Sequence, residues 1–219
     1  MRPTFRLLRR LSVVLAACAC ASAAPPPDPN VVTAPVRPLA ALAGQQVIVT
    51  PVNALREADA LGWTQQIPRS REFMRAFDDA LETELAARGL KSRWVFPEAL
   101  VRAGRNNPAY SVDPYTLAAA PLRSTALVAR SRVGDPLASQ LRTMIALQES
   151  ARAILIPVEL RFERLADGRG AAVVRLALLD GRLSEVLWLG EIASEPASTF
   201  SRDLLTSLAA HTADLITAP

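Results

Sequence analysis

Residues 153–194 narrow the choice of folds more than any other part of this sequence, because three apolar segments follow one another there with only short turns between them. Asp167-Gly168 and Asp180-Gly181 separate the segments, and glycine accepts the positive φ that tight hairpin connections require. The pattern predicts three antiparallel strands connected as a β-meander.

The first of these strands should have one buried and one solvent-exposed face, because apolar and charged side chains alternate along its second half. The side chains expected on the buried face are Val158, Leu160 and Phe162, and those expected on the exposed face are Glu159, Arg161 and Glu163. In the third strand, the same alternation would place Val186 and Trp188 on one face and Leu187 and Leu189 on the other.

A strand, a helix and a second strand are expected before the meander. Residues 44–52 and 94–96 contain the apolar runs of the two strands, and a helix between them is typical of a right-handed crossover that joins a parallel pair. Ser70 is the expected cap of that helix, and Gly89 should end it in a left-handed conformation. Its apolar stripe consists of Phe73, Phe77, Leu81 and Leu85.

Two more helices complete the expected fold. Asp135-Pro136 is a typical helix start, and another apolar stripe begins at Phe200 after the meander. We therefore expect an α/β (α+β) fold: a single domain with a mixed sheet of about five strands, made of a parallel pair and the C-terminal antiparallel meander, packed with about three main helices.

The N-terminus predicts export. Residues 1–17 combine four arginines with a short apolar run, which is typical of a signal peptide and too short to span a membrane as a helix. Leu15-Ala16-Ala17-Cys18 resembles the lipobox of bacterial lipoproteins, which implies that Cys18 becomes the first mature residue and carries acyl chains such as palmitate. Ala19 follows this cysteine, and lipoproteins without aspartate at that position usually go to the outer membrane. The alternative is a secretory signal cleaved after Ala23, which would leave a soluble periplasmic or secreted protein.

Residues 18–43 are rich in proline and alanine, and we expect them to be an extended tether between the lipid anchor and a periplasmic domain formed by residues 44–219. Four of the 25 Lys and Arg residues lie within the signal, which has no acidic residue, so the mature chain carries 21 basic and 21 acidic residues. A neutral, exported chain is not expected to bind nucleic acid.

Several kinds of chemistry lack the residues they need. Both cysteines lie near the N-terminus and His211 is the single histidine, so neither a metal site nor a cofactor is predicted. His211 borders the stripe of the last helix, where a structural role is far more common than catalysis. The carboxylates of the first helix, Asp78, Asp79, Glu82 and Glu84, are expected on its polar side or flanks, where solvation explains them better than acid–base catalysis. No catalytic residue is predicted.

The sequence resembles a group of periplasmic α/β domains. The residues that resemble it are Ala153-Ile-Leu-Ile-Pro-Val and Val174–Glu191, followed by a helix from Phe200. The group comprises the curli secretion lipoprotein, the amino-terminal domain of the Tol-system β-propeller protein, and lipoprotein activators of penicillin-binding proteins. The resemblance implies the fold but not a pore-forming role. Pro157, where relatives often have glycine, and an irregular insertion, residues 104–134, depart from the pattern.

Two irregular segments, residues 53–69 and 104–134, are the predicted partner-binding surface, because long loops in compact domains are often functional and aromatic side chains can anchor a partner. The predicted contact residues are Trp63, Tyr110, Tyr115, Arg130 and Arg132. The alternative is that both loops fold back on the domain and bury their aromatic side chains.

These observations predict a non-enzymatic lipoprotein, held by its lipid anchor at the periplasmic face of the outer membrane, that binds or assembles an envelope protein partner. Self-association is left open. The alternative is a soluble periplasmic hydrolase with a site that the sequence does not reveal.

Overall fold

The computed structural model describes residues 37–110, 112–148 and 151–218. The predicted signal, Cys18 and most of the predicted tether therefore lie outside the described residues. No helix among the described residues is long and apolar enough to cross a membrane.

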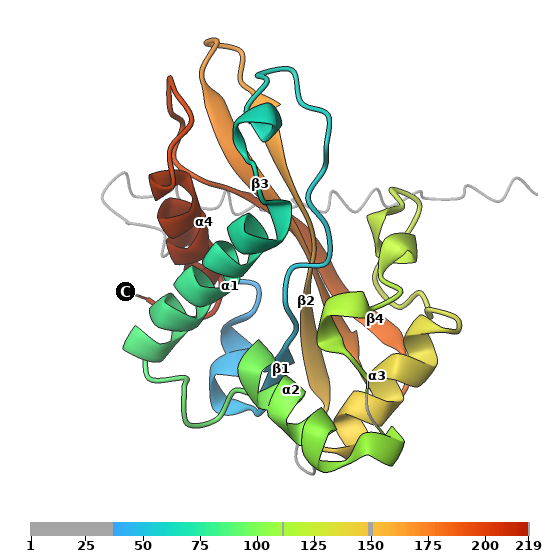
Figure 1. Ribbon diagram of the computed structural model, residues 1–219. Helices are drawn as coiled ribbons and strands as arrows, with labels where there is room; N and C mark the ends of the chain where they lie inside the picture. Colours follow the sequence, from blue (N-terminus) through green and yellow to red (C-terminus); the bar gives the residue numbers. More distant parts are fainter. Residues whose placement is uncertain (1–36, 111, 149–150, 219) are drawn as a thin grey trace, which may run out of the picture. The chain divides into compact units, whose positions relative to one another are not determined.

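The fold is a single α/β domain built on a mixed sheet in the order β1-β2-β3-β4 (Figure 1). β1 pairs with β2 in parallel, and β2, β3 and β4 form the predicted antiparallel meander. The strands are β1 (Val47–Val49), β2 (Ala153–Arg164), β3 (Gly170–Asp180) and β4 (Glu185–Ala193). The expected strand at residues 94–96 is reduced to a parallel bridge between Val95 and Ile48, because Pro97 begins a helix at once.

The sheet separates two apolar cores. The first core lies between the sheet and two helices, α1 and α4, and the second between the sheet, α2, α3 and part of the insertion (Figure 1). The helices are α1 (Ser70–Ala87), α2 (Pro97–Asn106), α3 (Leu137–Ala146) and α4 (Asp203–Asp214). The two cores on opposite sides of the sheet explain why β2 and β3 are almost continuously buried.

The expected stripe of α1 is confirmed: Phe73, Phe77, Leu81 and Leu85 are its buried side chains. Gly89 has φ +80, as expected for a left-handed residue after a helix. Ser70 differs from expectation, because it is the first residue of the helix and the N-cap, Arg69, makes no side-chain capping bond.

The expected face pattern of β2 is wrong after Pro157, because a β-bulge shifts the register between Pro157 and Glu159. Val158 packs in the second core, whereas Leu160 packs in the first. The face expected to be exposed is also largely covered, since Glu159 is 6% and Arg161 7% exposed. A bulge adds one residue without a partner and changes which face the following side chains occupy.

A second bulge alters β4 in the same way. The register shifts between Leu178 and Leu179, so Val186 packs in the second core and Trp188 against the first. The expectation that these two side chains share one face is therefore wrong.

The insertion is irregular as expected, but it is well packed. It contains three 3-10 turns, η3 (Pro108–Tyr110), η4 (Pro114–Thr116) and η5 (Ala120–Arg123). Leu117, Ala119, Leu122 and Val133 from this segment are buried in the second core. At the other end of the described chain, Leu39 and Leu42 pack in the first core, although they were expected to belong to the tether.

Candidate functional site

A groove of about 370 Å³ lies where the two predicted binding loops meet the outer side of α1. We call it the Tyr115 groove. Its principal lining residues are Asn53, Met74, Arg75, Asp78, Asp113 and Tyr115. The space continues along α2 past Glu98, Arg102 and Arg105.

Three hydrogen bonds join the walls of this groove. The backbone N–H of Val52 donates to Asp78 Oδ1 at 2.8 Å, which ties the first loop to α1. Asn53 Nδ2 donates to the carbonyl of Leu117 at 2.9 Å, which ties the first loop to the insertion. The Ala118 N–H donates to Gln140 Oε1 at 2.9 Å, which ties the insertion to α3.

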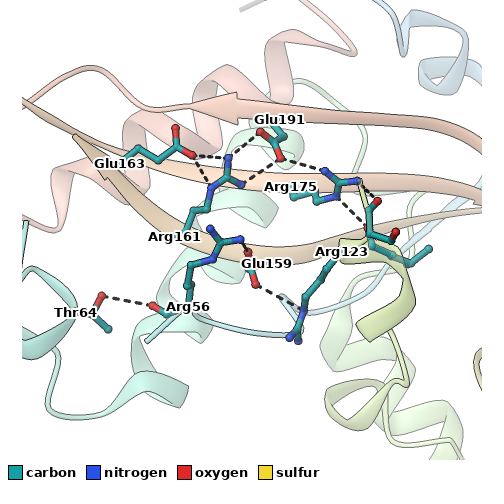
Figure 2. A network of polar contacts seen from close by, with 10 residues as sticks. Arg56, Thr64, Arg123, Glu159, Arg161, Glu163, Arg175 and Glu191 are labelled. Carbon is teal, nitrogen blue, oxygen red and sulfur yellow. Dashed lines mark hydrogen bonds and ion pairs between the residues drawn. The ribbon is translucent and has the colours of Figure 1, made fainter. Parts of the chain in front are cut away.

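A network of charged side chains fastens both loops to the sheet (Figure 2). Glu159, which is nearly buried on β2, hydrogen-bonds Arg56 of the first loop and lies 3.7 Å from Arg123 of the insertion. Arg175 on β3 donates to the carbonyls of Leu122 and Ser124 at 3.0 and 2.9 Å. Charge-assisted bonds therefore hold the two segments that form the groove.

Arg161 completes the network on the same face of the sheet. Its guanidinium contacts Glu191 at 2.7 Å and Glu163 at 2.6 Å, and Arg175 contacts Glu191 at 3.1 Å (Figure 2). The hydrogen bonds from Arg161 hold the pKa of Glu191 below its usual value.

Asp78 has the most unusual environment in the groove. Burial, with a smaller contribution from the neighbouring Asp79, raises its pKa to about 8, while the Val52 N–H and Arg75 act in the opposite direction. Its Oδ2 atom is buried and receives no hydrogen bond from any described residue. With a pKa of about 8, Asp78 is mainly protonated near pH 7.

Asp78 lies on the flank of α1, as expected, but its carboxyl group is not solvated as expected. It follows Met74 by four positions and precedes Leu81 by three, so it borders the apolar stripe of α1. The position of Asp78 beside the stripe could be inferred from the sequence, but its contact with the segment around Val52 could not.

Tyr115 forms the opposite wall. Its side chain is 37% exposed, and the guanidinium carbon of Arg75 lies 5.3 Å from its ring centroid, within cation–π range. Asp113 positions this residue by accepting a hydrogen bond from the Tyr115 N–H at 3.0 Å. Burial, followed by the charge of Asp78, raises the pKa of the Tyr115 phenol. Tyr115 is the predicted contact residue that the structure places in the groove.

Trp63 is not available to a partner, because it is 5% exposed and packs against the rings of Phe162 and Phe200 at 5.6 and 6.1 Å. The carboxylate of Asp59 accepts bonds from the N–H groups of Trp63 and Thr64, which folds this part of the loop over the core. For Trp63, the alternative of a buried loop aromatic is correct.

The remaining predicted residues lie elsewhere or are not described. Arg130 and Arg132 are exposed beside the start of β4, where the Arg130 N–H donates to the Val186 carbonyl at 2.7 Å. The side chain of Tyr110 is outside the described set. His211 Nδ1 lies 2.8 Å from the Ala193 carbonyl, consistent with the structural role expected for it.

Within the described ranges, no group of three or more His, Cys, Asp or Glu residues could hold a metal ion. The groove instead offers a protonated carboxyl group, an exposed phenol ring and guanidinium groups. This set suits a ligand that brings both hydrogen-bonding and apolar groups.

No protein-family model matches the sequence, and no curated protein matches it. Among solved structures, a PelC dodecamer from Paraburkholderia phytofirmans is similar with a TM-score of 0.40 and 16% identity, over 81% of this chain and 91% of that one. E. coli LpoB is similar with a TM-score of 0.36 and 12% identity, over 89% of this chain and 85% of that one. Lipoprotein GNA1162 from Neisseria meningitidis is similar with a TM-score of 0.34 and 16% identity, over 78% of this chain and 96% of that one.

The similar structures thus include LpoB and a Neisseria lipoprotein. These TM-scores and identities are too low to transfer a function to this chain.

Proposed function

We propose that this chain is a non-enzymatic lipoprotein of the cell envelope that binds or assembles a protein partner through the Tyr115 groove. The lipobox at Cys18 supports the lipid anchor and the outer-membrane location. The groove supports a binding role for the folded domain.

The balance of charge around the groove is the observation that carries this proposal. Cationic and anionic side chains are equally represented, while Asp78 is mainly neutral near pH 7. The cationic residues are Arg71, Arg75, Arg102 and Arg105. The anionic ones are Glu98 and Asp113 in the groove and its extension, and Asp79 and Glu82 in an adjoining hollow that shares Arg75, Asp78 and Tyr115 with the groove. A polyanion or a free phosphate would meet as much repulsion as attraction here, whereas a protein segment can supply both signs of charge.

The half-exposed ring of Tyr115 adds the second property of a protein-binding surface. Tyrosine is enriched among the residues that dominate interface energetics, because it supplies apolar area and a polar tip at little entropic expense. The fastened loops would keep this ring in place before a partner arrives, which reduces the ordering that binding requires.

Photo-crosslinking in intact cells tests the proposal. A benzophenone amino acid at position 115 of the full chain should give one discrete protein adduct, and Arg75→Glu should weaken it. The matched control places the same group at Val128, which is 62% exposed and does not line the groove or its extension. No adduct from position 115, or the same adduct from position 128, would contradict the proposal.

Asp78 is the observation that favours a second candidate function, that of a soluble periplasmic hydrolase. A carboxyl group with a pKa of about 8 can act as a general acid, and Asp113 lines the same groove. Incubating the purified chain with peptidoglycan, ester and glycoside substrates separates the two candidates. Turnover that Asp78→Asn abolishes would establish the enzyme, and no turnover is expected if the chain only binds.

A further inference from the structure

β4 is an edge strand of the sheet, and hydrogen bonds from described residues outside the sheet reach its backbone only near its two ends. At its start, the Val186 N–H and carbonyl bond to Ser131 and Arg130 at 2.8 and 2.7 Å. At its end, the Ala193 carbonyl lies 2.8 Å from His211 Nδ1. Between these points, no described residue outside the sheet hydrogen-bonds the backbone of residues 187–192.

The ladder with β3 decides which backbone groups of β4 point outward. The Ser194 N–H donates to the Ala172 carbonyl at 2.8 Å, so Ser194 points toward β3. Backbone direction alternates along an antiparallel strand. Ile192 and Gly190, which are opposite Val174 and Leu176, therefore also point inward. The N–H and C=O groups of Leu189 and Glu191 point outward.

We propose that two copies of this chain pair through antiparallel β4 strands centred on Gly190, which joins the two sheets edge to edge. The outward groups lie symmetrically, one residue to each side of Gly190. In this register Leu189 faces the partner's Glu191, and Glu191 faces the partner's Leu189. Each of these pairs exchanges two backbone hydrogen bonds. The register is thus compatible with a two-fold axis, which a closed dimer requires.

The residue at the axis fits this arrangement. Gly190 would oppose the partner's Gly190 as a non-hydrogen-bonded pair, in which Cα atoms lie about 4.5 Å apart and side chains crowd. A Cβ atom at Gly190 would lie 2.2 Å from Cζ2 of its own Trp188. The indole of Trp188 therefore already fills the space over Gly190, and Gly190 itself adds no side chain at the axis.

The flanking side chains are also compatible with self-pairing. Trp188 would oppose the partner's Ile192, and aromatic residues pair favourably with β-branched ones across strands. Both side chains are half-buried against the first core. On the other face, Glu191 is already compensated by Arg161 and Arg175 at 2.7 and 3.1 Å, so its charge does not oppose the approach of a second copy.

The edge has little protection against such pairing. Leu187, on the bulge of β4, is 46% exposed, and Val128 beside the start of the strand is 62% exposed. Monomeric proteins commonly protect a free edge with lysine, proline, an inward-pointing charge or a bulge, and the bulge of β4 at Leu187 lies three residues before the proposed axis. The segment 187–192 contains neither lysine nor proline, and its one charged residue is already paired.

Cysteine cross-linking of the full chain in its native membrane tests the proposal. A single Leu189→Cys substitution, in a Cys20→Ser background that retains Cys18, places two thiols diagonally across the proposed axis. A short bifunctional maleimide should then give a covalent dimer as the main product. Thr83→Cys on the exposed side of α1 is the matched control and should give at least tenfold less dimer.

A second pair of variants distinguishes the loss of strand pairing from a folding defect. Leu189→Pro removes an outward N–H that no described residue uses, so the monomer should fold while the detergent-purified chain sediments as a monomer. Leu189→Val keeps the N–H and should remain dimeric. Equal cross-linking from Thr83→Cys, a heterologous adduct at Leu189→Cys in place of the dimer, or unchanged sedimentation of Leu189→Pro would each overturn the proposal.

Discussion

Asp78 shows how one side chain can link the stability of this domain to its groove. Its pKa is raised to about 8 in the folded chain, against 3.8 for an ordinary aspartate. Between these two pH values, the unfolded chain has lost a proton that the folded chain still holds. The free energy of unfolding therefore falls as pH rises from about 4 to about 8.

Asp78→Asn should remove this pH dependence, because asparagine keeps an acceptor for the Val52 N–H and cannot ionise. We expect the variant to be more stable than the wild type at pH 8 by a few kcal/mol, since each tenfold difference in proton affinity between the folded and unfolded chains corresponds to about 1.4 kcal/mol. Thermal unfolding from pH 4 to pH 9 measures the difference between the two proteins. Asp203→Asn, at an exposed position that does not contribute to the pKa of Asp78, is the control and should track the wild type; a difference between wild type and Asp78→Asn that stays constant with pH would contradict the assignment.

Two aromatic residues from the predicted binding loops should behave in opposite ways. Trp63→Ala leaves a cavity in a cluster of aromatic rings, so we expect a loss of about 3–5 kcal/mol in the free energy of unfolding. Tyr115→Ala should lose less than about 1 kcal/mol, because more than a third of its side chain is exposed. Urea denaturation compares the two variants, and the proposed function requires Tyr115→Ala to weaken partner cross-linking from an adjacent position such as Thr116.

At the scale of secondary-structure elements, the insertion and the first loop depend on β2 through Glu159. Its carboxylate contacts Arg56 and Arg123, whose side chains are 52% and 39% exposed. The β-bulge at Val158 alters the side-chain pattern at this position. A local irregularity of one strand thus helps to place two loops that form the binding groove.

Glu159→Gln should loosen both loops while leaving the sheet intact. We expect a loss of about 1 kcal/mol in stability, since the released arginines can turn to solvent. Amide hydrogen exchange should accelerate at residues 53–56 and 120–124 and stay unchanged in β3. Glu163→Gln removes a carboxylate that contacts Arg161 alone and is the matched control; equal acceleration in both variants would mean that Glu159 does not hold the loops.

At the scale of the whole molecule, the lipid anchor determines where the groove and the β4 edge can act. Cys18→Ser should move the chain from the membrane fraction to the soluble periplasmic fraction and abolish incorporation of labelled palmitate. The physical reason is that several acyl chains on one residue anchor a protein durably, each contributing about 0.8 kcal/mol per buried CH₂. Cys20→Ser should change neither result. A wild-type chain that begins at Ala24 without acyl chains would contradict the anchoring proposal.

The periodicity of apolar residues was enough to predict the helices and strands whose buried faces follow a regular spacing. The stripe of α1 from Phe73 to Leu85 and the meander with its turn at Gly168 follow from spacing and turn chemistry alone. Such patterns report which side chains one element buries, so the fold class and most of the core could be predicted.

Only the tertiary structure decided the groove and the edge. Asp78 is covered because a loop that begins far away in sequence crosses α1, and Trp63 is buried because Phe162 and Phe200 meet above it. The bulges at Val158 and Leu187 arise from pairing between strands. Burial, pKa and outward backbone direction depend on neighbours that are distant along the chain, and local spacing carries no record of those neighbours.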